Sequence, residues 1–320
     1  MSSPFALAEN KAFSQQVPLL QTAWDSTSMG SFKCCPRYYQ YNIIYGFSSK
    51  IENIHLTFGQ HLHSCLEHYQ RDRADGLSHK EALNSTVVRV LSLTFNKSIG
   101  RPWFSDEPTK NRETLLRAVV WYIDKFAEND PINTIYLRNG KPAVELSFRY
   151  GMGIYSKLTN EEIFYCGHID RLGEWQDGIW GQDFKTSKSA LTPEFFEKYS
   201  PDNQISGYLF AGQIVFDTPI KGFVIDGIQV GATFARFQRG IVTRTQSQLQ
   251  EWFNDFQFYL AQAEVCAETE YYPQNDRSCN LFGGCPYRKV CSASPEVRDN
   301  LLKNLYTRRT WDPLTPRGGM

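Results

Sequence analysis

Residues 163–188 read IFYCGHIDRLGEWQDGIWGQDFKTSK, and this stretch decides the expected fold. The part up to residue 175 is rich in β-branched and aromatic residues, which favour a strand. Residues 176–178, QDG, then supply a hairpin turn, and IWGQDFKTS reads as the returning strand. Two adjacent strands are therefore predicted, with Asp170 near the end of one and Asp183-Phe184-Lys185 at the end of the other.

Periodicity outside this hairpin indicates helices first and strands in the centre of the chain. The segment 143–150, AVELSFRY, alternates as a further strand, and residues 222–230 and 232–242 read as two more. Apolar residues at helical spacing predict helices near residues 28–35, 58–71, 78–93, 109–126, 201–216 and 245–268. Ser78 and Glu81 form a capping box for the third of these. The expected fold is α/β or α+β with a helical N-terminal portion.

The composition is that of an ordinary globular protein of one large or two small domains. The chain has 320 residues, 41% hydrophobic and 21% charged, which excludes disorder, collagen and coiled-coil arrays. Basic and acidic residues number 34 each, so any nucleic-acid site must be a local patch. No membrane span or signal peptide is recognisable. We expect a cytoplasmic protein, with residues 1–25 as a flexible N-terminal segment and 293–320 as a C-terminal tail.

The residues at the two strand ends suit metal-dependent phosphate chemistry. Residues i and i+2 of a strand face the same way, so Asp183 and Lys185 share one face and Phe184 turns toward the core. With Asp170 beside them, two carboxylates suit Mg²⁺, and the Phe184 carbonyl could add an oxygen. The lysine can orient or deprotonate the attacking water and stabilise charge on the phosphate. A solvated hairpin edge with mixed charges is the alternative.

Four motifs in order make the chain resemble the RecB family of PD-(D/E)XK nucleases. That family has a histidine on an early helix, an aspartate in a G-x-x-D-R-like strand, a D-x-K strand and a Q-x-x-x-Y helix. The matching stretches are GQHLHSCLEHY with His63, GHIDRLGE with Asp170, DFKTSK with Asp183 and Lys185, and NQISGY with Gln204 and Tyr208. The resemblance covers residues 26–292 and implies a single nuclease domain with a restriction-endonuclease-like core, a central mixed sheet flanked by helices.

The resemblance also implies roles for single residues. The family's helix begins with a glycine four residues before its histidine, which fits Gly59 and His63 and not His61. Glu145 in AVELSF is a further candidate, with an exposed strand residue as the alternative. The metal is thus expected on His63, Asp170, Asp183, Phe184 and Glu145. The catalytic set is expected to be Asp170, Asp183, Lys185, Gln204 and Tyr208, the last two sharing a helix face where they can contact DNA or support the metal ligands.

Three cysteines fall within thirteen residues near the C-terminal end: Cys279, Cys285 and Cys291. In a reducing compartment such a cluster more often binds metal than forms disulfides, and a fourth ligand has to come from Cys34 or Cys35. Iron–sulfur relatives in the RecB family, such as the AddB nuclease and the CRISPR-adaptation nucleases, have one cysteine before the nuclease motifs and three behind them. The resemblance therefore implies a [4Fe–4S] cluster. Its first ligand is usually followed by proline, which favours Cys35, and a four-cysteine Zn²⁺ site is the alternative.

These features predict a Mg²⁺- or Mn²⁺-dependent DNA exonuclease in recombination, repair or viral DNA processing, similar to phage exonucleases and so compatible with a viral origin. The chain has no Walker A motif, so a helicase, recombinase or single-strand-binding protein is an expected partner. Candidates for the DNA surface are Arg37, Tyr38, Arg171 and Lys188. The alternatives are a noncatalytic DNA-binding or scaffold module of this fold, an RNA-directed nuclease and a CRISPR-adaptation nuclease.

Overall fold

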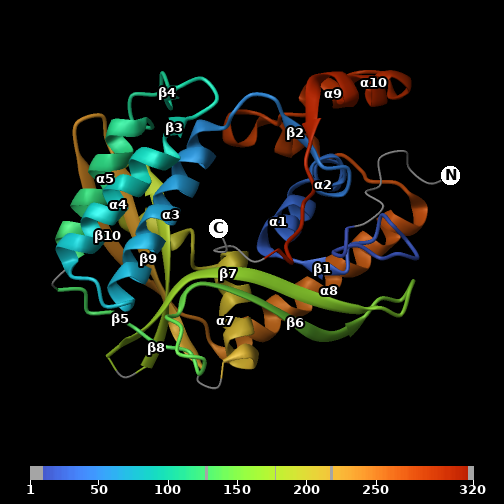
Figure 1. The fold of residues 1–320 in the computed structure, drawn as a ribbon. Helices are drawn as coiled ribbons and strands as arrows, with labels where there is room; N and C mark the ends of the chain where they lie inside the picture. The colour runs from blue at the N-terminus through green and yellow to red at the C-terminus, as the bar shows by residue number, and fades with distance from the viewer. Residues whose placement is uncertain (1–9, 127–128, 177, 217–218, 316–320) are drawn as a thin grey trace. The chain divides into compact units, whose positions relative to one another are not determined.

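The structure is a computed structural model that describes residues 10–126, 129–176, 178–216 and 219–315 (Figure 1). It divides into two units. Unit 1 comprises residues 1–52, 147–167 and 246–320, and unit 2 comprises residues 53–146 and 168–245. Strands β6 (Val144–Tyr155) and β7 (Glu162–Trp175) contribute residues to both units.

Unit 2 contains a sheet and the helices that pack on it. Its helices are α3 (Ile54–Ala74), α4 (His79–Leu93), α5 (Arg112–Phe126), α6 (Pro193–Glu197) and α7 (Asn203–Val215). Besides its shares of β6 and β7, its strands are β3 (Phe95–Asn96), β4 (Arg101–Pro102), β5 (Asn133–Thr134), β8 (Gly178–Ser187), β9 (Ile220–Val230) and β10 (Ala235–Val242).

The sheet of unit 2 is mixed. β7 and β8 pair antiparallel, β8 and β9 pair parallel, and β9 and β10 pair antiparallel. Parallel neighbours need a crossover, and the chain makes it by leaving β8, forming α6 and α7, and returning as β9. Tyr208 of α7 packs on Phe223 of β9, with ring centroids 5.9 Å apart. The predicted fold class, a central mixed sheet flanked by helices, is confirmed.

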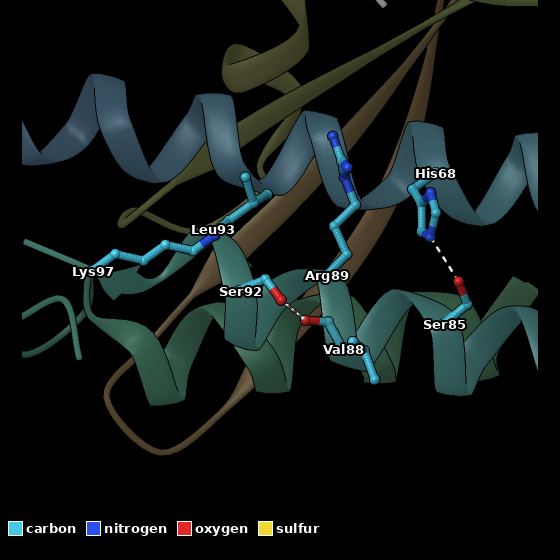
Figure 2. A pocket seen from close by; sticks show the side chains of 7 residues that line it. All are labelled: His68, Ser85, Val88, Arg89, Ser92, Leu93 and Lys97. Atoms are coloured by element: carbon cyan, nitrogen blue, oxygen red, sulfur yellow. Dashed lines mark hydrogen bonds between the residues drawn. The ribbon is translucent and has the colours of Figure 1, made fainter. Parts of the chain in front are cut away.

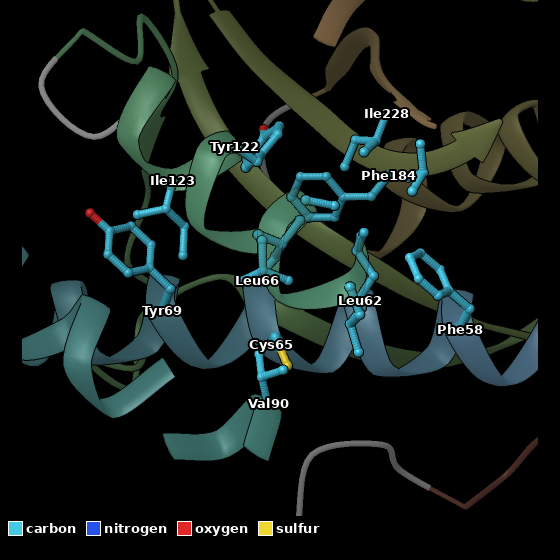
Figure 3. Packing of buried hydrophobic residues seen from close by; sticks show 14 of the residues in the cluster. Phe58, Leu62, Cys65, Leu66, Tyr69, Val90, Tyr122, Ile123, Phe184 and Ile228 are labelled. Atoms are coloured by element: carbon cyan, nitrogen blue, oxygen red, sulfur yellow. The ribbon is translucent and has the colours of Figure 1, made fainter. Parts of the chain in front are cut away.

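Helices α3, α4 and α5 share one hydrophobic core with the sheet (Figure 3). Leu62 and Leu66 of α3 are buried there with Phe184 of β8 and Ile228 of β9. Burying a side chain of this size stabilises the fold by about 1.5–3 kcal/mol, so this core fixes which side of α3 faces β8. Because Phe184 points into the core, its neighbours along the strand project from the opposite face.

The helix starts follow local capping chemistry. α4 begins at His79 behind the predicted capping box, in which Ser78 Oγ accepts a hydrogen bond from Glu81 N–H and a Glu81 carboxylate oxygen accepts one from Ser78 N–H. This prediction is confirmed. α3 begins at Ile54, four residues earlier than its apolar spacing predicts, because the Asn53 side chain accepts hydrogen bonds from the first turn.

Unit 1 gathers segments from both ends of the chain. Its elements, besides shares of β6 and β7, are β1 (Ala23–Trp24), α1 (Ser26–Cys34), α2 (Pro36–Tyr39), the π-helical turn Gln40–Ile44, β2 (Phe47–Ser49), α8 (Gln246–Thr269), the 3-10 helix Asp276–Gly283, α9 (Arg288–Cys291), α10 (Pro295–Leu305) and β11 (Tyr306–Arg308). β11 pairs with β2. Ala12, Leu20 and Trp24 are buried, so packing in unit 1 extends into the segment expected to be flexible.

Two further expectations concern the turn of the hairpin and the membrane. The predicted turn includes Asp177, which lies outside the described residues. Its neighbour Gln176 has a φ of 53°, in the left-handed region that such turns use. Among the helices that the structure describes, none is both long and apolar enough to cross a membrane.

Candidate active site

The two predicted carboxylates meet where β7 and β8 separate. The paired residues of these strands run from Trp175 opposite Gly178 to Arg171 opposite Gln182, and the next residue of each strand is Asp170 and Asp183. There the Phe184 N–H donates a hydrogen bond to Asp170 Oδ2 at 3.0 Å. An aspartate side chain thus takes the place of a backbone acceptor, and the strands part around two acidic groups.

Asp183 is the more deeply buried of the two carboxylates. Its side chain is 4% exposed and its Oδ2 lies 2.7 Å from Lys185 Nζ, yet among the described residues that oxygen has no partner in hydrogen-bonding geometry. Burial raises the pKa of Asp183, and the charge of Asp170 adds to this, while Lys185 opposes it. A buried acidic oxygen held near a second carboxylate is a place where a cation would bind favourably.

His63 reaches this group from α3. Its Nδ1 lies 3.1 Å from Asp170 Oδ2, and its ring packs edge-on against Phe184. Burial disfavours the charged imidazole, but the Asp170 carboxylate outweighs it and the pKa of His63 is raised. His61, two residues earlier, instead has its ring against Trp103. The structure therefore places His63, and not His61, beside the predicted ligand.

A chain of polar groups supports the lysine. Lys185 Nζ donates a hydrogen bond to Gln204 Oε1 at 2.9 Å, and Gln204 Nε2 donates one to Tyr208 Oη at 3.0 Å. Gln204 and Tyr208 are one turn apart on α7, so both contacts come from one helix face. The structure thus brings together Lys185, Gln204 and Tyr208 as the motif order predicts.

Two further carboxylates bear on the expected ligand set: Glu145, which was predicted as a ligand, and Glu67, which was not. Glu145 lies in β6 with a φ of 50° and is not among the charged groups that shift the pKa of Asp170, Asp183 or His63, so its metal role stays a prediction. Glu67, one turn after His63 on α3, was missed. The charges of Asp170 and His63 both act on its pKa, and its carboxylate forms an ion pair with Arg71 at 2.9 Å. The spacing of four residues from His63 is the signal that could have found it.

A buried ionic network lies next to the two carboxylates along β7 and β8. Arg171 Nη1 donates to Asp130 and to Gln182, and Arg239 bridges Asp130 and Asp226. Arg171 is 4% exposed, so its expected place on a DNA surface is wrong. Its guanidinium is held by the core of unit 2, because residue 171 faces away from Asp170 along the strand.

The other DNA-surface candidates lie in different units. Lys188 of unit 2 forms an ion pair with Glu107 at 2.7 Å. In unit 1, Arg37 donates to the Tyr272 carbonyl and the Gln274 side chain, and the Tyr38 ring packs against Tyr287. Their contact with DNA stays a prediction.

The four predicted cluster ligands all belong to unit 1. Cys35, Cys279, Cys285 and Cys291 are free thiols. Burial raises the pKa of Cys285 and of Cys291, and the other predicted ligands, Cys35 among them, raise it further. Nevertheless, among the described residues no three histidine, cysteine, aspartate or glutamate side chains form a group that could hold a metal ion.

The remaining three cysteines are apolar in character, as expected. Cys65, Cys166 and Cys266 are buried, at 0%, 0% and 8% exposure. Burial raises the pKa of the Cys65 thiol to about 12, so this side chain stays neutral in the core that it shares with α4 and α5.

A groove of about 420 Å³ lies between α3 and α4, apart from the carboxylates (Figure 2). His68 and Arg89 line it, but both are engaged: His68 Nε2 lies 2.7 Å from Ser85 Oγ, and Arg89 donates to Ser64. The hydrogen bonds tie α3 to α4 across the groove. This feature therefore supports the helix that presents His63.

Comparisons with known proteins give the family of the chain. Residues 26–292 match the PD-(D/E)XK nuclease superfamily. Among solved structures, the chain is similar to a "Putative exonuclease" from Eubacterium rectale, with 12% identity, a TM-score of 0.50 and coverage of 84% of this chain and 90% of that one. It also matches SSO0001 at 11% identity and a TM-score of 0.32, over 75% of this chain and 94% of that one. No curated protein matches. At such identities the structural likeness concerns the fold, but the family match spans most of the sequence, and the chain belongs to the PD-(D/E)XK nuclease superfamily.

Proposed function

We propose that the chain is a Mg²⁺- or Mn²⁺-dependent exonuclease that hydrolyses DNA phosphodiester bonds. The observation that carries this proposal is the group formed by Asp170, Asp183 and Lys185 where β7 and β8 separate. Members of the superfamily are nucleases that typically use divalent metals such as Mg²⁺. A single nuclease domain over residues 26–292 is part of the proposal.

The donor set fits a divalent cation. Mg²⁺ keeps several waters and needs only one or two protein carboxylates, and Asp183 offers a buried oxygen that is ion-paired with Lys185 Nζ at 2.7 Å but is not in hydrogen-bonding geometry with the described residues. Asp170 and Asp183 would hold the ion, and His63 would orient Asp170 through their 3.1 Å contact. The Phe184 carbonyl and Glu145 remain further candidates. When bound, the ion would lower the pKa of a water and offset negative charge on the phosphate.

The side chains around the metal ligands act on the phosphate. In hydrolysis, the oxygen of water bonds to phosphorus while one bond from phosphorus to a sugar oxygen breaks, and negative charge grows on the phosphate oxygens. The Lys185 ammonium has three N–H groups, and its contacts with Asp183 and Gln204 leave at least one for the phosphate or the water. Tyr208 holds Gln204, which holds the lysine in place.

The proposal is tested by digesting end-labelled single- and double-stranded DNA, and RNA of the same sequence, with Mg²⁺, Mn²⁺ or a chelator. Shortening of DNA from one end, only with metal, is the expected result. Internal fragments would indicate an endonuclease, and cleavage of RNA alone would indicate an RNA-directed enzyme. No cleavage of any substrate by folded protein with either metal would favour the noncatalytic DNA-binding alternative.

We propose in addition that Cys35, Cys279, Cys285 and Cys291 bind a [4Fe–4S] cluster in unit 1. Support comes from the contact of Cys35 with the segment of Cys279, in which Asn275 N–H donates to Cys35 Sγ at 3.3 Å, and from the order of the cysteines along the chain. Four thiolates are the usual ligands of such a cluster and also of structural Zn²⁺, which is the alternative. Iron and labile-sulfide assays on anaerobically purified protein separate the two.

The biological setting is proposed only in outline. DNA ends produced in recombination, repair or viral DNA processing are the proposed substrates, with a helicase, recombinase or single-strand-binding protein as partner and the cytoplasm as location. DNA trimming in CRISPR adaptation remains the alternative. The preference for single-stranded or double-stranded DNA in the digestion assay is the measurement that favours one of these settings over the others.

A further inference from the structure

The carboxylate of Glu107 sits in a ring of donors near the end of β8. One oxygen lies 2.7 Å from Lys188 Nζ. The other accepts hydrogen bonds from the hydroxyl and the backbone N–H of Thr109 at 2.9 and 3.4 Å. These bonds lower the pKa of Glu107 to about 2. We call Glu107, Thr109, Lys110 and Lys188 the Glu107 cradle.

Lys110 adds a buried positive charge to the cradle. The residue is 2% exposed, and among the described residues its Nζ has no hydrogen-bond partner, although it lies 4.3 Å from the centre of the Phe58 ring. Burial lowers the pKa of Lys110 to about 8, and Lys188 lowers it while Glu107 raises it. A buried ammonium without a hydrogen bond is costly, so an anion bound nearby would be stabilised by its charge.

The cradle has more positive than negative groups around it. The charges of Lys188, Lys110 and Glu107 also act on the pKa of His55, at the start of α3. Burial and the two lysines lower the pKa of His55. Two ammonium groups thus act against one carboxylate, so the cradle keeps a net positive charge that attracts an anion.

The position of the cradle relates it to the proposed chemistry. Lys188 follows Lys185 by three residues at the end of β8. An extended chain advances about 3.3 Å per residue, so the two backbone positions are at most about 10 Å apart. Side chains three residues apart in a regular strand point to opposite faces, but β8 ends at Ser187, so this alternation does not hold at Lys188. The backbone spacing leaves an anion at Lys188 within reach of a DNA strand whose next phosphate lies at Lys185.

We propose that the Glu107 cradle binds a DNA backbone phosphate adjacent to the one that is cleaved, and that Glu107 occupies this site when DNA is absent. The inference rests on the proposed function. A phosphodiester carries one negative charge, as the carboxylate does, and accepts hydrogen bonds from the same ammonium, hydroxyl and N–H donors. The Glu107 side chain is 29% exposed, so it can turn toward solvent. Lys110, whose Nζ is covered, acts through its charge.

The test measures DNA affinity in the background of Asp183→Asn, which removes cleavage. A fluorescent single-stranded oligonucleotide is titrated at several salt concentrations and followed by anisotropy. Glu107→Gln removes the competitor and is expected to tighten binding about two- to fivefold, the range of an exposed ion pair. The matched control is Glu113→Gln, an equal charge change at an exposed position of unit 2, for which no such tightening is expected.

Loss of the cations should have the opposite effect. Lys188→Gln is expected to weaken binding and to reduce the slope of log Kd against log salt by about 0.7, the value for one phosphate of a single strand. Lys80→Gln, exposed on α4, is its control and should leave the slope unchanged. Lys110→Met should weaken binding without lowering thermal stability, which a purely structural lysine would not do.

A double exchange separates anion binding from a structural ion pair. Glu107→Lys with Lys188→Glu keeps an ion pair and so keeps stability, but it is expected to bind DNA more weakly than the parent. The proposal is overturned if Glu107→Gln binds no tighter than Glu113→Gln, or if the exchanged protein binds like the parent. Metal-dependent cleavage by the unmodified chain is scored separately, so that failure of the proposed function is distinguishable from failure of the cradle.

Discussion

Asp170 Oδ2 lies 3.1 Å from His63 Nδ1, so the aspartate is held by α3 as well as by its own sheet. His63→Ala removes the contact from α3 and leaves Asp170 Oδ2 held only by the Phe184 N–H among these two contacts. We expect the Mg²⁺ concentration for half-maximal cleavage to rise about 10- to 100-fold, as for loss of other groups that orient metal ligands. Mn²⁺ should restore part of the rate. His61→Ala is the control, and an equal rise for both variants would contradict the assignment.

Asp183→Asn keeps the shape of the side chain and removes its charge. Losing one preorganised charge of this kind should cost about 3 kcal/mol or more of transition-state stabilisation, a hundredfold or more in rate. Burial raises the pKa of Asp183, so its charge is costly, but that charge also raises the pKa of the buried Lys185. The two effects oppose each other, and the variant should still fold. Cleavage rates and melting curves are compared with those of Asp255→Asn, an exposed change. Full metal-dependent activity of Asp183→Asn would place the catalytic centre elsewhere.

Lys185→Ala should bind DNA and metal yet fail to turn over. The hydrogen bond that supports Lys185 can be tested separately. Gln204→Leu removes the acceptor, Gln204 Oε1 at 2.9 Å, and leaves the Lys185 ammonium in place. We expect Gln204→Leu to lower kcat about tenfold, an intermediate loss consistent with one hydrogen bond to a charged group. Single-turnover rates and DNA affinity are measured for both variants. A loss of affinity with unchanged kcat in Gln204→Leu would make this residue a DNA contact instead.

Lys110 gives the free energy of unfolding a distinctive pH dependence. Its pKa is lowered from an ordinary 10.5 to about 8, so between these values the unfolded chain binds more protons than the folded one. Lys110 therefore opposes folding below pH 8, and this penalty disappears as the pH rises toward 10.5. Lys110→Met should be more stable at pH 7 by up to about 3 kcal/mol, with the difference vanishing near pH 10.5. Urea unfolding at several pH values measures this difference in the free energy of unfolding, with Lys80→Met as the control. A difference that does not change with pH would argue against a titrating Lys110.

The two adjacent cysteines allow a paired test of the cluster. Cys35→Ser should bleach the brown protein, remove iron and sulfide and lower thermal stability, whereas Cys34→Ser should do none of these. The reason is that the Cys35 thiol faces the segment that carries Cys279, since its Sγ accepts a hydrogen bond from Asn275 N–H at 3.3 Å, and that a proline follows Cys35 and not Cys34. Colour lost with Cys34→Ser and kept with Cys35→Ser would reverse the assignment, and colourless protein containing zinc would favour the tetrahedral site.

Sequence reasoning located the residues whose chemistry depends on local pattern. Asp183 and Lys185 share a strand face because of a two-residue period, and Gln204 and Tyr208 share a helix face because of a four-residue spacing. His63 could be chosen over His61 only through the family's glycine spacing. The structure now gives a physical reason, the contact of His63 with Asp170.

What the sequence could not predict depends on contacts between distant segments. Arg171 was expected on a basic and aromatic DNA surface near the site, and the Asp130 that compensates its buried charge is 41 residues away in the sequence. Lys110 likewise carries no local sign of burial, since Phe58 and Lys188 approach it from other elements. Such pairings follow from the three-dimensional fold and leave no periodicity along the chain.

The division of the chain has a consequence for its synthesis. Unit 2 ends at residue 245, whereas unit 1 needs residues 246–320 as well as the first 52. A ribosome therefore completes the unit that carries Asp170 and Asp183 while the N-terminal segment of unit 1 still waits for its C-terminal partner segments. Since domains generally fold as they emerge, the early part of unit 1 must remain unsatisfied until residues 246–320 have been made, and it is the part most exposed to chaperones and proteases during that interval.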